Sequence, residues 1–207
     1  MVKGTPELIT ERREEIINAC EKLYQKLSFK EITLKEIGKE TSFSRPTIYN
    51  YFETKEEIFL ALYEREYIRW NEELKEILNE NSKLNTEELA KKISISLSNR
   101  PQLLKLLAMN NYDMEANSRE ELLVSFKLAF GESIKNLKLV LKKFCKNMTD
   151  SKIESFIYIF LPFLFGIYPY TNVTKKQKNA MEKAKIDFKY QTIYEITYRC
   201  LHELLNK

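Results

Sequence analysis

The chain has 207 residues, of which 43% are hydrophobic and 31% charged, and its net charge is only +4, so it is a globular protein without a strongly basic tail. Four glycines and five prolines are too few for a glycine-rich phosphate loop or for a β-sandwich or barrel. A single histidine, His202, leaves no Ser/His/Asp or Cys/His constellation and no two-histidine metal site, so we expect neither catalysis nor a metal or other cofactor.

The predicted elements are helices from end to end, because apolar residues recur at three- and four-residue steps and no segment alternates like a strand. Residues Thr33, Thr54, Ser118 and Ser151 each stand three positions before a glutamate, which is the spacing of a helix-capping box. The fold class is therefore all-α. The predicted helices cover about residues 7–27, 34–40, 45–52, 55–80, 86–99, 101–112, 118–147, 151–168, 175–185 and 187–206.

The charged N-terminus lacks the apolar segment of a signal peptide. The cysteines Cys20, Cys145 and Cys200 are far apart and include no CxxC pair, which fits packed thiols in a reducing compartment. We therefore expect a cytoplasmic protein.

The segment from Thr33 to Phe59 has the form of a helix-turn-helix. Two short helices, about 34–40 and 45–52, flank a four-residue turn, which sets the second helix at a steep angle to the first. The outward residues at the start of the second helix suit a major groove, where Arg reads guanine, Asn reads adenine, and Thr or Pro contacts the thymine methyl group. These candidates are Arg45, Pro46, Thr47, Tyr49 and Asn50.

The run TLKEIGKETSFSRPTIYNYFETKEEIF resembles the DNA-binding domain of the tetracycline-repressor (TetR) family. The resemblance covers about residues 8–60 and is most specific in Tyr-x-Tyr-Phe followed three residues later by Lys55. It implies a homodimeric, usually repressive transcription regulator that binds double-stranded DNA at a palindromic operator and carries a small effector in its C-terminal domain. By position it implies phosphate contacts by Thr33, Lys35, Tyr51 and Lys55. The domains would be residues 1–55 for DNA binding and 56–207 for effector binding and dimerisation, with the helix at about 55–80 connecting them.

Three positions depart from the family pattern. Ser28 and Ser42 stand where glycine is usual, and we expect a left-handed backbone there at a cost of about 1 kcal/mol each. Gly38 replaces the usual alanine and either costs a similar amount or lets the helices pack closer. None of the three removes a proposed DNA contact.

The C-terminal half is rich in aromatic residues and methionines, which line apolar pockets but more often pack a core. We expect a moderately apolar small-molecule effector, because only Lys105 interrupts residues 103–111 with a charge. The effector candidates are Met109, Asn110, Tyr112, Phe126, Phe130 and Phe160.

The uncharged stretch 155–174 could suggest a membrane span, but its continuously apolar part, 156–168, reaches roughly 20 Å as a helix against about 30 Å of hydrocarbon. It predicts a helix buried on all sides, in part by a partner subunit, and no membrane association. The resemblance implies a dimer built from the helices at about 151–168 and 187–206. The interface candidates are Phe156, Ile159, Phe163, Tyr194, Ile196, Tyr198 and Leu201.

Several of these residues have a plainer interpretation. Tyr49 and Tyr51 can be core residues, and Lys35 and Lys55 can be ordinary solvated charges. An enzyme is disfavoured, because compact carboxylate pairs such as Glu56-Glu57 are expected on solvated helix faces. The alternative that remains is a structural or adaptor bundle whose helix-turn-helix no longer binds DNA.

Overall fold

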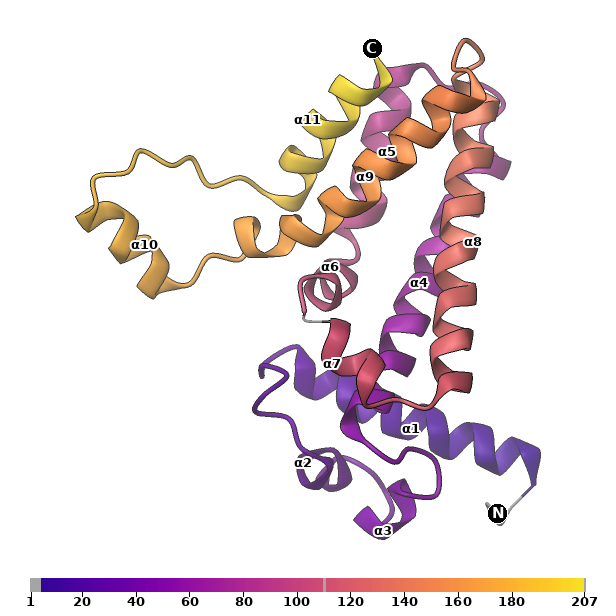
Figure 1. Ribbon diagram of the computed structural model, residues 1–207, viewed down its shortest axis with the longest axis vertical. Coiled ribbons are helices and arrows are strands. Elements are labelled where there is room, and N and C mark those ends of the chain that lie inside the picture. Colours follow the sequence, from indigo (N-terminus) through magenta and orange to yellow (C-terminus); the bar gives the residue numbers. More distant parts are fainter. Residues whose placement is uncertain (1–4, 110, 207) are drawn as a thin grey trace. The chain divides into compact units, whose positions relative to one another are not determined.

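The computed structural model describes residues 5–109 and 111–206, which form helices joined by connections, with no strand among them (Figure 1). The chain divides into two compact units. Unit 1 comprises Met1–Glu66 and Asn110–Phe130, and unit 2 comprises Tyr67–Met109 and Gly131–Lys207. The helices are α1 (Pro6–Tyr24), α2 (Leu34–Lys39), α3 (Arg45–Ile48), α4 (Lys55–Glu80), α5 (Thr86–Ser98), α6 (Pro101–Leu107), α7 (Asn111–Ala116), α8 (Glu120–Phe144), α9 (Asp150–Thr171), α10 (Lys175–Lys183) and α11 (Ile193–Leu205).

A small apolar core holds the helix-turn-helix of unit 1 together. Helix α2 packs against both α1 and α3. Ile37 of α2, Ile48 of α3 and the following Phe52 are fully buried. Thr33 caps α2, because its hydroxyl oxygen accepts the Glu36 N–H at 3.3 Å. The core orients α3, since Ile48 could leave it only by exposing apolar surface to water.

Helix α3 starts where the sequence predicts and ends earlier. After Ile48 the chain continues in a tighter turn, in which Asn50 N–H donates to the Thr47 carbonyl at 3.1 Å and Tyr51 N–H to the Ile48 carbonyl at 2.9 Å. These bonds span three residues, as in a 3₁₀ turn. The prediction of a helix over 45–52 is therefore wrong at its C-terminal end.

A buried carboxylate ties the connection between α7 and α8 to the start of α4. Glu57 is only 1% exposed. Its oxygens accept hydrogen bonds from Arg119 Nε at 2.7 Å, from Arg119 Nη2 at 2.9 Å and from the Glu53 N–H at 2.8 Å. Arg119 Nη2 also donates to the Tyr51 carbonyl at 3.1 Å. The expectation of a solvated Glu57 is wrong, because its charge partner lies 62 residues away in the sequence.

Thr54 adds a second contact to the same connection. Its hydroxyl donates to the Asn117 carbonyl at 2.8 Å and accepts the Glu57 N–H at 3.1 Å. Thr54 therefore caps α4 as predicted, while the Glu57 side chain turns to Arg119 instead of completing the capping box. Ser118 does not open a helix at the predicted place, because α8 begins at Glu120.

Unit 2 contains a bundle in which α11 packs against α5 and α9, and α9 also against α6 (Figure 1). Trp70 is fully buried there, and its Nε1 donates to Ser96 Oγ at 3.1 Å. Helix α11 starts at Ile193 and not near 187, because Thr192 and Glu195 form a capping box with hydrogen bonds of 3.2 and 2.7 Å. The single helix predicted over 101–112 is two helices, α6 and α7.

Helix α9 is longer than predicted at both ends. It is capped by Thr149, whose hydroxyl accepts the Lys152 N–H at 3.3 Å, and it continues through Pro162 and Pro169. Within the part of the chain that the structure describes, α9 is one helix long and apolar enough to cross a membrane. Core helices of soluble proteins meet the same criteria.

One face of α9 is open in the single chain. Tyr158, Ile159 and Phe165 are 78%, 53% and 41% exposed, so burial on all sides would need the partner subunit and stays a prediction. The opposite face, with Phe160 and Leu164, is buried in unit 2. A helix that is apolar all round needs cover on both sides, and one bundle supplies only one of them.

The substitution Glu57→Gln measures what the buried ion pair contributes to stability. Burial alone would raise the pKa of Glu57, but hydrogen bonds from Arg119 and from backbone N–H groups outweigh it and hold the pKa below its usual value. The resulting stabilisation is complete above the pKa of an unfolded glutamate and is lost as the pH falls through the lower folded pKa. We expect Glu57→Gln to lower the free energy of unfolding by about 1.5–3 kcal/mol at pH 7.

Urea unfolding at several pH values checks this expectation. The loss should begin to shrink below about pH 4, where the unfolded glutamate is protonated, and should disappear only below the lower pKa of the folded carboxylate. Glu56→Gln, one residue earlier and less buried, is the control and should unfold like the wild type. A Glu57→Gln loss that is the same at pH 3 and pH 7 would contradict a role for the charge.

Candidate nucleic-acid interface

The candidate interface is the start of α3, which the core presents to solvent. Arg45, Pro46, Tyr49 and Asn50 are exposed, and Thr47 is half-exposed. Ser44 precedes the helix in an extended conformation, and Pro46 lies in its first turn, where a missing N–H costs no hydrogen bond. A short polar surface with an exposed arginine and asparagine therefore stands clear of the helix-turn-helix core.

Arg45 is held along α3 by Tyr49. Its Nη2 donates to the Tyr49 hydroxyl at 2.9 Å, and its guanidinium lies 5.7 Å from the centre of that ring. Tyr49 is 47% exposed, so it is not a core residue of this chain. The contact limits the rotamers of Arg45 and reduces the entropy that the side chain would lose on binding.

Four of the predicted residues meet at one cleft of unit 1. Thr33, Lys35, Arg45 and Lys55 line a cavity of about 330 Å³. The other described lining residues are Leu34, Thr54 and Glu56, so three cations face one carboxylate. Such a concave surface with an excess of positive charge attracts anions such as a DNA phosphate.

Lys55 has a structural part as well as a place in the cleft. Its Nζ donates to the carbonyl oxygens of Phe29 and Ile32 at 3.0 and 3.3 Å and lies 4.0 Å from the centre of the Phe29 ring. An ammonium group has three donors, so one is left for a phosphate. Lys35 is exposed, and Tyr51 is half-buried.

The residues that depart from the family pattern have local explanations. Lys185, with φ of 55°, is the one described non-glycine residue with a positive φ, so the left-handed backbone expected at Ser28 and Ser42 is wrong. Ser42 instead donates from its N–H and its hydroxyl to Glu15, the hydroxyl at 3.1 Å. A Cβ at Gly38 would lie 3.5 Å from the nearest atom, Cβ of Arg45, which is ordinary contact. An alanine would fit there.

The sequence analysis missed two groups of residues near the interface. Arg12 and Arg13 of α1 stand over the rings of Phe43 and Phe52 at 5.9 and 5.4 Å. Arg119 holds the Tyr51 carbonyl just after α3. Helical periodicity carries no signal for such contacts, because the partners lie far apart in the sequence and several of them stand outside helices.

The effector candidates do not share one environment. Phe126 is buried with its ring centre 4.7 Å from that of Tyr63, and Phe160 is buried with its ring centre 5.2 Å from that of Phe156. Tyr112 is 83% exposed. Tyr112, Phe126 and Phe130 belong to unit 1, Met109 and Phe160 to unit 2, and Asn110 lies outside the described residues. A pocket formed by these residues stays a prediction.

The dimer candidates also divide by exposure. Phe156 and Leu201 are buried within the subunit, because they face the α5–α9–α11 bundle, and so offer no open surface to a partner. The others are accessible. Ile159 is exposed, and Phe163, Tyr194, Ile196 and Tyr198 are half-exposed.

Comparison with known proteins agrees with this architecture. Residues 16–62 match the model of the bacterial regulatory proteins of the tetR family, and residues 64–190 match that of the tetracyclin repressor-like C-terminal domain. The chain is 30% identical over 94 residues to YdgC, an HTH-type transcriptional regulator of Bacillus subtilis (strain 168). That match covers 45% of this chain and 48% of YdgC, so the chain spans about half the length of this curated relative.

Solved structures share the fold over nearly the whole chain. The fatty acid degradation regulator FadR of Bacillus halodurans is 16% identical with a TM-score of 0.59, covering 99% of this chain and 96% of FadR. MbdR of Azoarcus sp. CIB is 17% identical with a TM-score of 0.57, covering 93% and 96%. FadR of Bacillus subtilis, solved in complex with stearoyl-CoA, is 19% identical with a TM-score of 0.52, covering 93% and 97%.

These matches confirm the all-α fold with an N-terminal helix-turn-helix domain and a C-terminal helical domain. They also confirm the predicted resemblance, because the C-terminal model alone spans more than half of the chain. Proteins of this kind are DNA-binding transcription factors and not enzymes. The chain belongs to the tetracycline-repressor family of bacterial transcriptional regulators.

Proposed function

We propose that the protein is a cytoplasmic repressor that binds a palindromic operator as a homodimer and leaves it when a small, moderately apolar effector binds. The observation that supports it best is the exposed surface of Arg45, Thr47, Tyr49 and Asn50 at the start of α3, beside a cationic cleft. The alternative of a structural bundle gives no reason for an arginine and an asparagine to be exposed at this place.

In this proposal one group of residues reads the bases and another binds the phosphates. Arg45 and Asn50 read base edges, because a guanidinium pairs with guanine and a carboxamide with adenine in the major groove. Lys35 and Lys55 contact phosphates and fix the register of α3 without reading sequence. Two such helices on a two-fold axis would read half-sites about 34–36 Å apart or wider.

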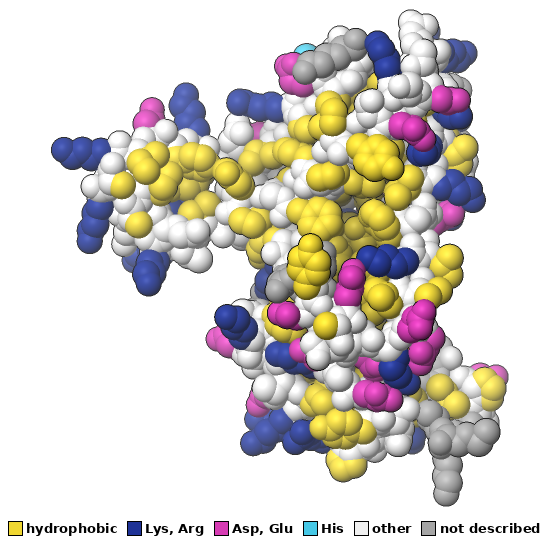
Figure 2. Space-filling view, in the orientation of Figure 1, with side chains coloured by type: hydrophobic (Ala, Val, Ile, Leu, Met, Phe, Trp, Pro, Cys, Tyr) yellow, Lys and Arg dark blue, Asp and Glu magenta, His cyan; other side chains and the backbone are white. Residues whose placement is uncertain are grey.

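The proposed dimer surface is the open face of α9 together with the segment that follows it. Tyr158, Ile159 and Phe165 are exposed on α9, and Figure 2 shows hydrophobic side chains gathered over α9 and over the projecting segment that carries α10. The ring of Phe188 in that segment lies 6.2 Å from that of Tyr170 at the end of α9 and 5.3 Å from that of Tyr190, although each ring remains at least 36% exposed. An apolar surface of this kind is typical of a subunit interface.

The proposed effector carries a long apolar part. The aromatic residues of the C-terminal half support this proposal, and the Bacillus subtilis relative of the same fold was solved in complex with stearoyl-CoA, a compound of that description. Compounds with an acyl chain are therefore the class of effector to test first.

The proposed route from effector to DNA runs through the turn between α7 and α8. This turn belongs to the effector half of the sequence, but it packs in unit 1, where Arg119 holds the Tyr51 carbonyl and Asn117 holds Thr54. Any displacement of α8 that moves Arg119 would therefore pull on the segment between α3 and α4. A small change there alters the spacing of the two recognition helices, and the DNA repeat tolerates little change.

Alanine substitutions separate base reading from phosphate binding. We expect Arg45→Ala and Asn50→Ala each to lose about 1–3 kcal/mol of operator affinity and to relax preference at one base pair per half-site. Lys35→Ala should weaken all sequences alike and reduce the salt dependence by about one phosphate contact. Lys176→Ala on α10 is the charge-matched control. Binding measured by fluorescence anisotropy on operators selected from a random pool checks this, and a protein without sequence preference would contradict the proposal.

Ile159→Glu tests the dimer surface. Ile159 is exposed in the single chain, so the variant should fold, but a dimer would bury the new charge without a partner. We expect light scattering to report a monomer at micromolar concentration. Ile95→Glu, at an isoleucine of similar exposure on α5, is the matched control and should stay dimeric. A monomeric wild type would refute the homodimer, and a stable Ile159→Glu dimer would move the interface elsewhere.

Effector affinity measured with and without operator tests the coupling. Because linkage is reciprocal, operator DNA should weaken stearoyl-CoA binding by the factor with which stearoyl-CoA weakens operator binding, about 5–150-fold in typical cases. Arg119→Gln should reduce this factor toward one. Absence of stearoyl-CoA binding would exclude the proposed effector class, and equal affinities with and without DNA would exclude the coupling.

A further inference from the structure

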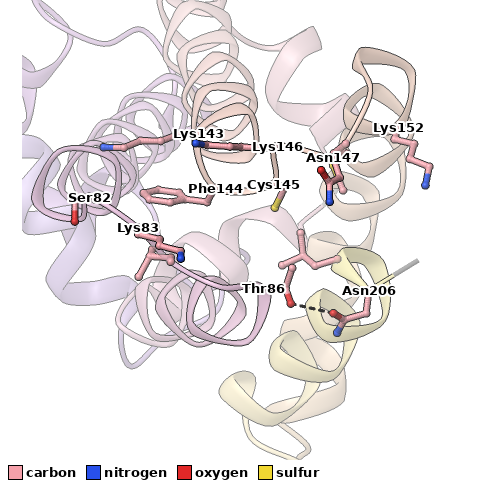
Figure 3. Close-up of a pocket in the computed structure, with 13 residues that line it drawn as sticks. Ser82, Lys83, Thr86, Lys143, Phe144, Cys145, Lys146, Asn147, Lys152 and Asn206 are labelled. Atoms are coloured by element: carbon pink, nitrogen blue, oxygen red, sulfur yellow. Dashed lines mark hydrogen bonds between the residues drawn. The ribbon is translucent and has the colours of Figure 1, made fainter.

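A second cationic cavity lies in unit 2, far along the chain from the helix-turn-helix. It is formed where the α4–α5 connection, the end of α8, the α8–α9 connection and the end of α11 meet (Figure 3). Its volume is about 620 Å³, which is within the range of small-molecule sites. None of the described effector candidates lines it.

The inner surface of this cavity is apolar. Leu84 and Leu205 are 8% and 7% exposed, and Phe144, Cys145 and Met148 are half-buried along the same lining. Thr86 donates to Asn206 Oδ1 at 2.9 Å at the edge of the cavity, so the end of α11 is tied to the start of α5 (Figure 3). An apolar ligand body would replace water on this surface at a gain of free energy.

The rim of the cavity is positively charged. Lys83, Lys143, Lys146 and Lys152 line it, and no aspartate or glutamate belongs to the described lining. In Figure 3 the first three surround the Phe144 ring, whereas Lys152 points outward. The three like charges around Phe144 repel one another and create a local field that favours an anion.

Two other lysines of α8 pair with carboxylates, whereas among the described residues Lys83 and Lys146 of the cavity do not. Lys142 pairs with Asp150 at 2.8 Å and Lys138 with Glu154 at 3.4 Å, so the charges that face α9 are neutralised. Lys83 and Lys146 have no carboxylate of the described residues within 4.0 Å. Lys143 is fixed at the wall, because its Nζ donates to the Leu78 carbonyl at 2.6 Å.

We propose that this cavity binds a small anionic amphiphile. Its apolar part would lie against Phe144, Leu84 and Leu205, and its phosphate or carboxylate would be held by Lys83 and Lys146. A lysine binds such a group as a point charge and does not require the planar geometry that an arginine imposes, so both head groups belong to the class. The proposal concerns unit 2 alone and does not depend on DNA binding.

Calorimetric titration of the full-length protein tests the chemistry of the ligand. The probes are dodecyl phosphate and dodecanoate below their micelle concentrations, dodecanol as the neutral chain, and inorganic phosphate as the isolated head group. We expect dodecyl phosphate, dodecanoate or both to bind about tenfold or more tightly than dodecanol and than inorganic phosphate. Comparing dodecyl phosphate with dodecanoate shows which head group is preferred. Equal binding of dodecanol would overturn anion recognition, and equal binding of inorganic phosphate would overturn the apolar part.

Charge reversal tests the location. Lys83→Glu with Lys146→Glu should abolish binding, whereas Lys26→Glu with Lys30→Glu, at two exposed lysines of unit 1, makes the same change in net charge and should leave it unaltered. If the first variant unfolds, which circular dichroism would detect, Lys83→Gln with Lys146→Gln replaces it and should weaken binding about tenfold or more. Unaltered binding to the folded cavity variant would overturn the assignment.

The Cys145 thiol gives an independent measure of occupancy. It lines the cavity, and burial raises its pKa, so it should react slowly with iodoacetamide and more slowly still when a ligand covers it. Cys200, half-buried on α11 and absent from the described lining, is the internal control within the same mass spectrum. If dodecyl phosphate or dodecanoate binds at saturation and Cys145 still reacts with iodoacetamide at the same rate, the ligand lies elsewhere and the proposal is refuted.

Discussion

The buried charge of Glu57 is the constraint on which the architecture of unit 1 depends. A carboxylate that is 1% exposed must have its oxygens satisfied, because an unpaired buried charge costs several kcal/mol. Arg119 and the Glu53 N–H satisfy it. The same guanidinium holds the Tyr51 carbonyl, so the turn before α8 cannot separate from the end of the helix-turn-helix without stranding a charge. The stability of unit 1 and the proposed route from effector to DNA therefore depend on the same few atoms.

The proposed recognition element, α3, contains little regular structure. Helix α3 has four residues and no side-chain cap of its own. Its orientation comes from the burial of Ile48 and Phe52 and from Lys55, which crosses back to the carbonyls of residues 29 and 32. Because the core holds α3 from behind, the exposed residues Arg45, Pro46, Tyr49 and Asn50 lie outside that core. They are therefore available for recognition, and Arg45 is already oriented by Tyr49.

Unit 2 has two surfaces that a single folded chain leaves incomplete. One is the apolar face of α9 and the segment carrying α10, for which a second subunit is the proposed partner. The other is the lysine-lined cavity between the ends of α8 and α11, whose positive charge favours binding of an anion. The two differ in chemistry and need different partners. A large apolar face is covered by another protein surface, whereas a small hollow with a charged rim fits a compact amphiphile.

The sequence by itself determined the features that neighbouring residues decide. The helical class, the turn at 41–44 and the caps at Thr33 and Thr54 all follow from spacings of three or four residues, within one helical turn. Only the tertiary structure decided which groups Glu57 and Lys55 contact and which face of α9 stays exposed. The partner of Glu57 lies 62 residues away, the acceptors of Lys55 lie 23 and 26 residues away, and the open face of α9 depends on which helices cover it. A period read along the chain carries no information about pairs that meet only when the helices pack.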